Sequence, residues 1–95
     1  MERVSWHLPG FESPKNNLFG YIDWGGRKIR IYIFETHMLG VFYVDIDEYT
    51  DSSKIGKKLF SVRIDNKCLF ECMRIAQDIS WEILEGKEIS YASTY

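Results

Sequence analysis

Aromatic and basic side chains recur in three segments of the chain, in a combination suited to binding single-stranded nucleic acid. The stacking candidates are Tyr32, Phe34 and Tyr43, and the candidates for phosphate contact are Lys28, Arg30, Lys57, Lys58 and Arg63. Flat rings offer surfaces on which bases stack, and Lys and Arg side chains attract phosphates. If the fold places these side chains on one surface, we expect it to bind single-stranded DNA or RNA.

The same surface also suits a protein interface. Three acids interrupt the set, Asp23, Asp45 and Asp47, and the whole chain carries 12 Lys plus Arg against 14 Asp plus Glu, a net charge of −2. No uniform basic field is therefore available, and exposed aromatic patches commonly mark protein contacts. The alternative hypothesis is a small acidic interaction module, such as an immunity protein or a phage-encoded inhibitor of a host defence nuclease, that binds a basic partner. A homodimer is the commonest form of such an interface, and we expect one.

Enzyme chemistry finds little support in the sequence. The two histidines, His7 and His37, fall in segments without a nucleophile or a paired carboxylate at a meaningful spacing. The acids between residues 45 and 51 lack the spacing of a calcium-binding loop. We therefore expect no catalytic residue, no cofactor and no metal site.

The cysteines Cys68 and Cys72 are four residues apart and share one face of a helix. A disulfide between them would be strained, and a zinc site would need them to converge with His7 and His37 without a knuckle spacing. We interpret both as small hydrophobic residues of the core, in a protein of a reducing compartment.

The length and composition predict one domain spanning residues 1–95. Of the 95 residues, 45% are hydrophobic and 27% are charged, which allows a buried core and excludes disordered and low-complexity classes. No apolar run reaches the roughly 18 residues that cross a bilayer, and the first residues lead into no apolar signal core. We expect a cytoplasmic protein.

Four strands are predicted by alternating hydrophobicity, at residues 18–24, 27–35, 41–47 and 57–64, with turns at 25–26, 36–40 and 49–56. Ile29, Ile31 and Ile33 point to one side of the second strand, and Arg30, Tyr32 and Phe34 to the other. In the fourth strand the pattern directs Phe60, Val62 and Ile64 inward and Lys57, Leu59, Ser61 and Arg63 outward. Residues 1–17 are predicted to form an arm or loop.

One helix follows, at residues 65–86, where the period changes from two to 3.6. Asp65 or Asn66 is expected to cap it and Gly86 to end it. Its apolar stripe consists of Cys68, Cys72, Ile75, Ala76, Ile79 and Ile83. The tail at 87–95 includes an expected short strand at 89–92. The fold class is α+β: a four-stranded antiparallel meander over residues 18–64, followed by one C-terminal helix packed on one face, or ββββα.

Two motifs in this order resemble a known family. They are Phe-Tyr-Val-Asp-Ile-Asp-Glu-Tyr at residues 42–49 and, after a polar loop, Gly-Lys-Lys-Leu-Phe-Ser-Val at residues 56–62. With the helix that follows, they resemble the transcriptional coactivators of the positive-cofactor-four type and the related Pur-alpha repeats, over residues 18–85. The resemblance implies a ββββα unit that dimerises and grips single-stranded DNA along its curved sheet.

The chain departs from this family pattern at two positions. The family has a basic residue before the Glu-Tyr pair and an aromatic residue after it, whereas this chain has Asp47 and Thr50 there. The Gly-Lys-Lys motif is retained, so the resemblance implies phosphate contact at Lys57 and Lys58.

Overall fold

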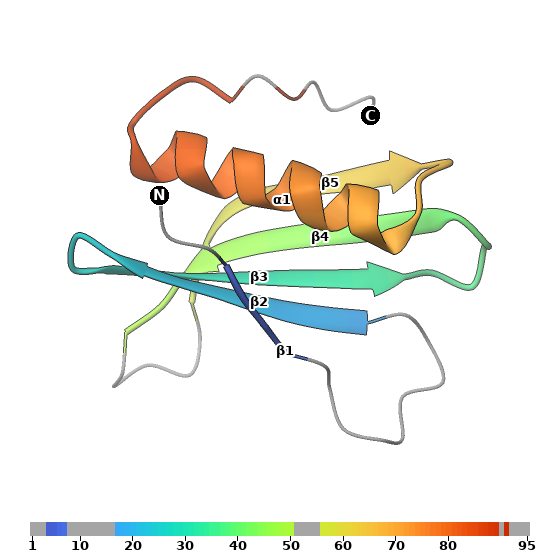
Figure 1. Cartoon of the computed structure of the whole chain (residues 1–95), viewed down its shortest axis with the longest axis horizontal. Coiled ribbons are helices and arrows are strands. Elements are labelled where there is room, and N and C mark those ends of the chain that lie inside the picture. Colours follow the sequence, from blue (N-terminus) through green and yellow to red (C-terminus); the bar gives the residue numbers. More distant parts are fainter. Residues whose placement is uncertain (1–3, 8–16, 51–55, 90, 92–95) are drawn as a thin grey trace.

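A five-stranded antiparallel sheet crossed by one helix forms the body of the protein in a computed structural model (Figure 1). The structure describes residues 4–7, 17–50, 56–89 and 91. The strands lie side by side in chain order: β1 (Ser5–His7), β2 (Asn17–Trp24), β3 (Arg27–Glu35), β4 (Val41–Glu48) and β5 (Lys57–Asp65), followed by α1 (Leu69–Leu84). The predicted α+β class, a meander followed by one C-terminal helix, is confirmed.

The core lies between the sheet and α1. Every second residue of β3 points toward the helix, and Ile29, Ile31 and Ile33 are each 0% exposed. Alternate residues of β4 and β5 continue this apolar layer, and Cys72, Ala76 and Ile79 of α1 cover it. Each fully buried aliphatic side chain stabilises the fold by about 1.5–3 kcal/mol. The apolar side of the sheet and the apolar stripe of the helix therefore pack together in one core layer, as the sequence predicts.

The turn between β2 and β3 follows from two glycines. Gly25 and Gly26 have φ values of 61° and 77°, which residues with a Cβ atom rarely adopt. Trp24 and Arg27 pair directly across this two-residue turn. The predicted hairpin is confirmed, and it fixes the register that places Tyr32 opposite Phe19.

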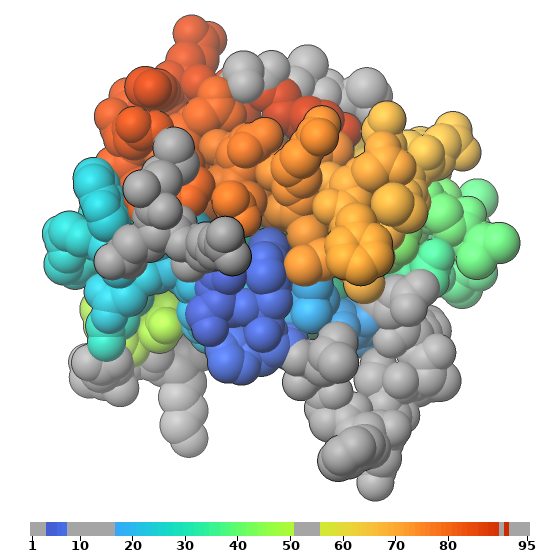
Figure 2. Space-filling view, viewed as in Figure 1, coloured from blue at the N-terminus to red at the C-terminus, as the bar shows by residue number. Residues whose placement is uncertain are grey.

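The strand β1 corrects the expectation that residues 1–17 form only an arm. Ser5, Trp6 and His7 pair with Tyr21, Gly20 and Phe19 of β2, and β1 lies at the surface below α1 (Figure 2). A three-residue strand is too short to show a period, which is why the pattern did not predict it. Residues 1–3 and 8–16 lie outside the described part of the chain.

The beginning of the helix also differs from the prediction. Asp65 still belongs to β5, and Asn66 adopts a left-handed conformation with φ 58° in the connection. Cys68 is the N-cap residue, and its backbone N–H donates a hydrogen bond to the Glu71 carboxylate at 3.5 Å. Cys68 is therefore exposed rather than part of the apolar stripe, whereas Cys72 is fully buried.

The end of the helix agrees with the sequence, whereas the two described residues of the strand expected at 89–92 do not lie in a strand. Gly86, with φ 71°, follows directly after the C-cap, and its N–H donates to the Ile83 carbonyl at 3.1 Å. Ile89 and Tyr91 pack against the core without forming the expected strand, and residues 90 and 92 lie outside the described residues. Among the described residues, no helix is both long enough and apolar enough to cross a membrane.

The contact between β1 and Gly20 gives a first prediction. A Cβ atom on Gly20 would lie 2.6 Å from side-chain atoms of both Trp6 and Val4. Gly20→Ala is therefore expected to lower the free energy of unfolding by about 1–3 kcal/mol, because β1 must move away. Urea denaturation measures this loss of stability. The loss caused by Gly20→Ala should be smaller when Trp6 is already replaced by alanine. Equal losses in both backgrounds would contradict the proposed clash with Trp6.

The two thiols give a second prediction. Burial raises the pKa of Cys72 to about 11, so its thiol is both inaccessible and protonated at neutral pH. A thiol reagent at pH 8 should modify Cys68 at once and leave Cys72 unmodified until the protein is unfolded in denaturant. Mass spectrometry after digestion identifies the labelled residue, and rapid labelling of Cys72 in the native protein would contradict the structure.

Candidate interaction face

The side of the sheet opposite α1, here called the open face, collects most of the predicted binding residues. Because the isoleucines of β3 point toward the helix, Arg30, Tyr32 and Phe34 point away from it. The register places Tyr43 of β4 opposite Phe34, and Arg63 of β5 opposite Tyr43. The fold therefore brings side chains from three strands onto one face.

Four half-buried rings form a row across the open face, here called the aromatic row: Phe19, Tyr32, Phe34 and Tyr43. The centroids of neighbouring rings lie 4.6 Å apart for Phe19 and Tyr32, 4.9 Å for Tyr32 and Phe34, and 5.5 Å for Phe34 and Tyr43. Interplanar angles of 19° to 30° make the rings nearly parallel. The first two pairs are stacked and Tyr43 is tilted against Phe34, and these contacts occupy ring surface that a base would need.

A second aromatic group stands beside the row and includes residues that the sequence analysis did not assign to the site. Tyr21 contacts His7 and Tyr49, with centroid distances of 5.5 and 6.1 Å, and the Arg30 guanidinium lies 5.7 Å from the centre of the Tyr49 ring. His7 reaches this face because β1 pairs with β2. The sequence analysis assigned His7 and Tyr49 to loops. Tyr49 follows the last residue of β4, but its backbone N–H donates a hydrogen bond to the Lys28 carbonyl of β3 at 3.0 Å, which holds its ring on this face.

Carboxylates neutralise the best-placed cation of the open face. Arg30 donates two hydrogen bonds to Asp47, at 2.6 and 3.2 Å. This contact raises the pKa of Arg30 despite partial burial of the guanidinium, which therefore stays charged. Asp47 thus binds the Nε and one Nη of Arg30 and neutralises its charge, which weakens the attraction of Arg30 for a phosphate.

Two further cations of this face also have acidic neighbours. The Arg63 Nε donates to Asp65 at 2.8 Å, and the Lys58 ammonium lies 3.9 Å from the Asp45 carboxylate. Asp45 in addition accepts a short hydrogen bond from the Ser61 hydroxyl. The charges on this face are therefore largely balanced in pairs.

Lys57 does not lie on the open face, contrary to the alternation predicted for β5. In the sheet register Lys57 is opposite Glu48 of β4, and Glu48 is opposite Ile29 of β3, whose side chain is in the core. Because directly opposite residues point to the same side of a sheet, Lys57 is on the helix side. Glu48 also accepts two hydrogen bonds from Arg27, at 2.8 and 2.9 Å, which lower the pKa of Glu48.

A β-bulge explains this departure. The β4–β5 register shifts between Ile46 and Asp47, so that Asp47 pairs with Lys58, and Leu59 is the extra residue. Lys58 thereby turns to the open face, whereas Leu59, which was expected to point outward, is half-buried and packs against the core. Lys28 lies opposite Asp23, at the end of the open face near the β2–β3 turn.

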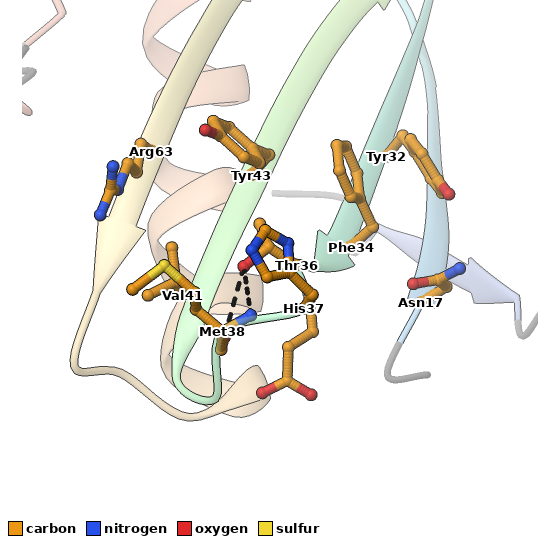
Figure 3. A pocket seen from close by; sticks show the side chains of 10 residues that line it. Asn17, Tyr32, Phe34, Thr36, His37, Met38, Val41, Tyr43 and Arg63 are labelled. Carbon is orange, nitrogen blue, oxygen red and sulfur yellow. Dashed lines mark hydrogen bonds between the residues drawn. The ribbon is translucent and has the colours of Figure 1, made fainter. Parts of the chain in front are cut away.

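Two shallow hollows flank the aromatic row. One, of about 480 Å³, lies between Phe34, Tyr43 and Arg63 and the β3–β4 turn that carries His37 and Met38 (Figure 3). The Met38 backbone N–H donates to the Thr36 hydroxyl at 3.0 Å and so orders this turn. The other hollow, of about 460 Å³, is lined by Phe19, Arg30, Tyr32, Asp45, Asp47 and Lys58. Hollows of this size can accept a protruding side chain of a partner.

The described residues bring together no three His, Cys, Asp or Glu side chains that could hold a metal ion. Comparisons of the chain with protein-family models, with curated proteins and with solved structures found no match. What the structure shares with the coactivators named above is the layout alone, an antiparallel meander followed by one C-terminal helix.

The unequal burial of two ion pairs on this face gives a third prediction. Side-chain exposures are 31% and 21% for Arg30 and Asp47, but 38% and 47% for Arg63 and Asp65. A double-mutant cycle with alanine is expected to give a coupling of about 1 kcal/mol for the first pair and less than about 0.5 kcal/mol for the second. Chemical denaturation at low salt measures both cycles, and equal couplings would contradict the assigned difference.

Proposed function

We propose that the protein is a small protein-binding module that docks a partner on its open face. The observation that carries this proposal is the aromatic row on a sheet face that α1 leaves uncovered, with neighbouring cations already paired to carboxylates. Tyrosine and arginine are enriched at the centres of protein interfaces, where they fill pockets and lose their water.

The mutual stacking of the rings favours a protein partner. Rings held by their neighbours lose little conformational entropy when a partner covers them, so the row is preorganised for binding. The paired charges favour the same conclusion, because bidentate ion pairs such as Arg30–Asp47 enter an interface without leaving a buried charge unpaired. The two hollows beside the row add places where side chains of the partner can insert.

Single-stranded nucleic acid is the second candidate, and the position of Arg63 supports it. Arg63 is on the strand next to Tyr43, and its ion pair with Asp65 is exposed, so it is more easily diverted to a phosphate than Arg30. Lys58, whose side chain is 66% exposed, is the other cation suited to this role. The coactivator-like layout agrees with this candidate at the level of fold.

A titration separates the two candidates and is the fourth prediction. Fluorescence anisotropy of a labelled single-stranded oligonucleotide, beside a duplex control, should show no binding tighter than about 10⁻⁵ M at physiological salt, because Arg30, Lys58 and Arg63 of the open face already have carboxylate neighbours. Micromolar binding that prefers the single strand and weakens steeply with salt would contradict the protein-binding proposal and support the second candidate.

A matched pair of variants tests the protein-binding proposal directly. Arg63→Glu combined with Tyr43→Ala changes the open face, whereas Arg74→Glu makes the same charge reversal at an exposed position of α1. A partner captured by the wild type should be kept by Arg74→Glu and bind the face variant about 30-fold more weakly or worse, the effect of losing one interface hot spot. Circular dichroism checks that both variants fold. Equal binding to all three proteins would show that the open face is not the docking site.

A further inference from the structure

The hollow of about 480 Å³ beside the β3–β4 turn, here called the turn hollow, lies at one end of the aromatic row. Tyr43 is the last ring of this row, and within the described part of the chain its only ring contact is with Phe34, at 5.5 Å. His37 and Met38 lie on the turn side of the hollow, across from Phe34 and Tyr43 (Figure 3). The row therefore ends at a space that can hold a further group.

Hydrogen bonds within the β3–β4 turn hold the rim of this hollow in place. The Thr36 N–H donates to the Val41 carbonyl at 2.9 Å, and the Val41 N–H donates to the Met38 carbonyl at 3.1 Å. The Gly40 carbonyl accepts a hydrogen bond of 2.9 Å from the Asn66 N–H, which attaches the turn to the segment after β5. The hollow is therefore preformed, and a ligand does not have to order it.

Other polar groups of the turn are also engaged within it. The Thr36 hydroxyl accepts a hydrogen bond from the Met38 N–H at 3.0 Å and donates one to the Met38 carbonyl at 3.3 Å. The Gly40 N–H donates to the Glu35 carboxylate at 3.1 Å. Proteins that read a nucleobase form hydrogen bonds to its polar edge, and these groups are already used. An apolar occupant is therefore favoured over a base.

The charges that line the turn hollow cancel one another. Glu35 and Arg63 are the two side chains of the lining with a full charge, and their signs are opposite. Phe34, Met38 and Tyr43 supply apolar surface between them. A charged side chain that entered this space would lose water without meeting a net opposite charge, which is unfavourable. The lining therefore suits a neutral occupant.

We infer that the turn hollow binds a neutral aromatic side chain of the protein partner, which continues the aromatic row beyond Tyr43. Aromatic rings attract one another in offset-stacked or edge arrangements at centroid distances of about 4.5–7 Å, the range already found along the row. The flexible Met38 thioether adds a contact that favours aromatic rings. This inference rests on the proposed function and adds the chemistry of the group that the partner inserts.

Small-molecule probes test the inference on the full chain, as the fifth prediction. In NMR titrations that follow backbone amides, N-acetyltryptophanamide is expected to shift the signals of His37, Met38 and Tyr43. It should bind about fivefold more tightly than N-acetylleucinamide, because ring stacking adds to apolar burial. Adenosine is the nucleic-acid arm of the test. Equal binding of the tryptophan and leucine probes, no shift at these three residues, or tighter binding of adenosine would overturn the inference.

Two neighbouring positions of the turn provide matched variants. Met38 lines the hollow and is 51% exposed, whereas Leu39 is 94% exposed and is not part of the lining. Met38→Asp puts a charge into the wall and is expected to weaken binding of the tryptophan probe by about tenfold or more. Leu39→Asp makes the same change of charge outside the hollow, and the affinity should stay within about twofold of the wild type. Equal weakening in the two variants would refute binding in the turn hollow.

The same variants separate this inference from the proposed function. If a partner binds Met38→Asp and Leu39→Asp equally well but loses affinity for the variant with Tyr43→Ala and Arg63→Glu, the open face docks the partner and the inference about the hollow is wrong. If the hollow binds the tryptophan probe but the open-face variant keeps the partner, the proposed function is wrong and the aromatic preference of the hollow stands.

Discussion

The burial of alternate β3 side chains beneath α1 is the constraint on which the rest of the structure depends. Ile29, Ile31 and Ile33 are completely inaccessible, and shifting the strand by one residue would expose all three. The same constraint forces Arg30, Tyr32 and Phe34 to the other side. The aromatic row is therefore a consequence of core burial on the opposite face, and its position is as fixed as that of the core.

The open face balances its charges within itself, which separates it from a simple phosphate-binding surface. Arg30 is held by Asp47 in an ion pair on the open face. Fold and binding chemistry are thus decided by different residues of the same strand, and a shared layout does not carry a shared ligand.

The two edges of the sheet differ as strongly as its two faces. β1 covers only part of β2, and Trp6 and Val4 pack closely over Gly20 there. At the opposite edge, the bulge at Leu59 divides β5 into a part with lysines and a regular part.

Local patterns in the chain suffice to predict the α+β class, the four longer strands, the glycine turn at 25–26 and the helix that ends near Gly86. These features depend on local periods and on backbone preferences that neighbouring residues fix. These patterns also predict that Tyr32, Phe34 and Tyr43 share one face, because alternation is a local property. Four features could not be predicted in this way: the pairing of β1, the bulge that turns Lys57 away, the capping position of Cys68 and the partner of each charge. These depend on contacts between residues distant in the chain, and no period in the sequence records such contacts.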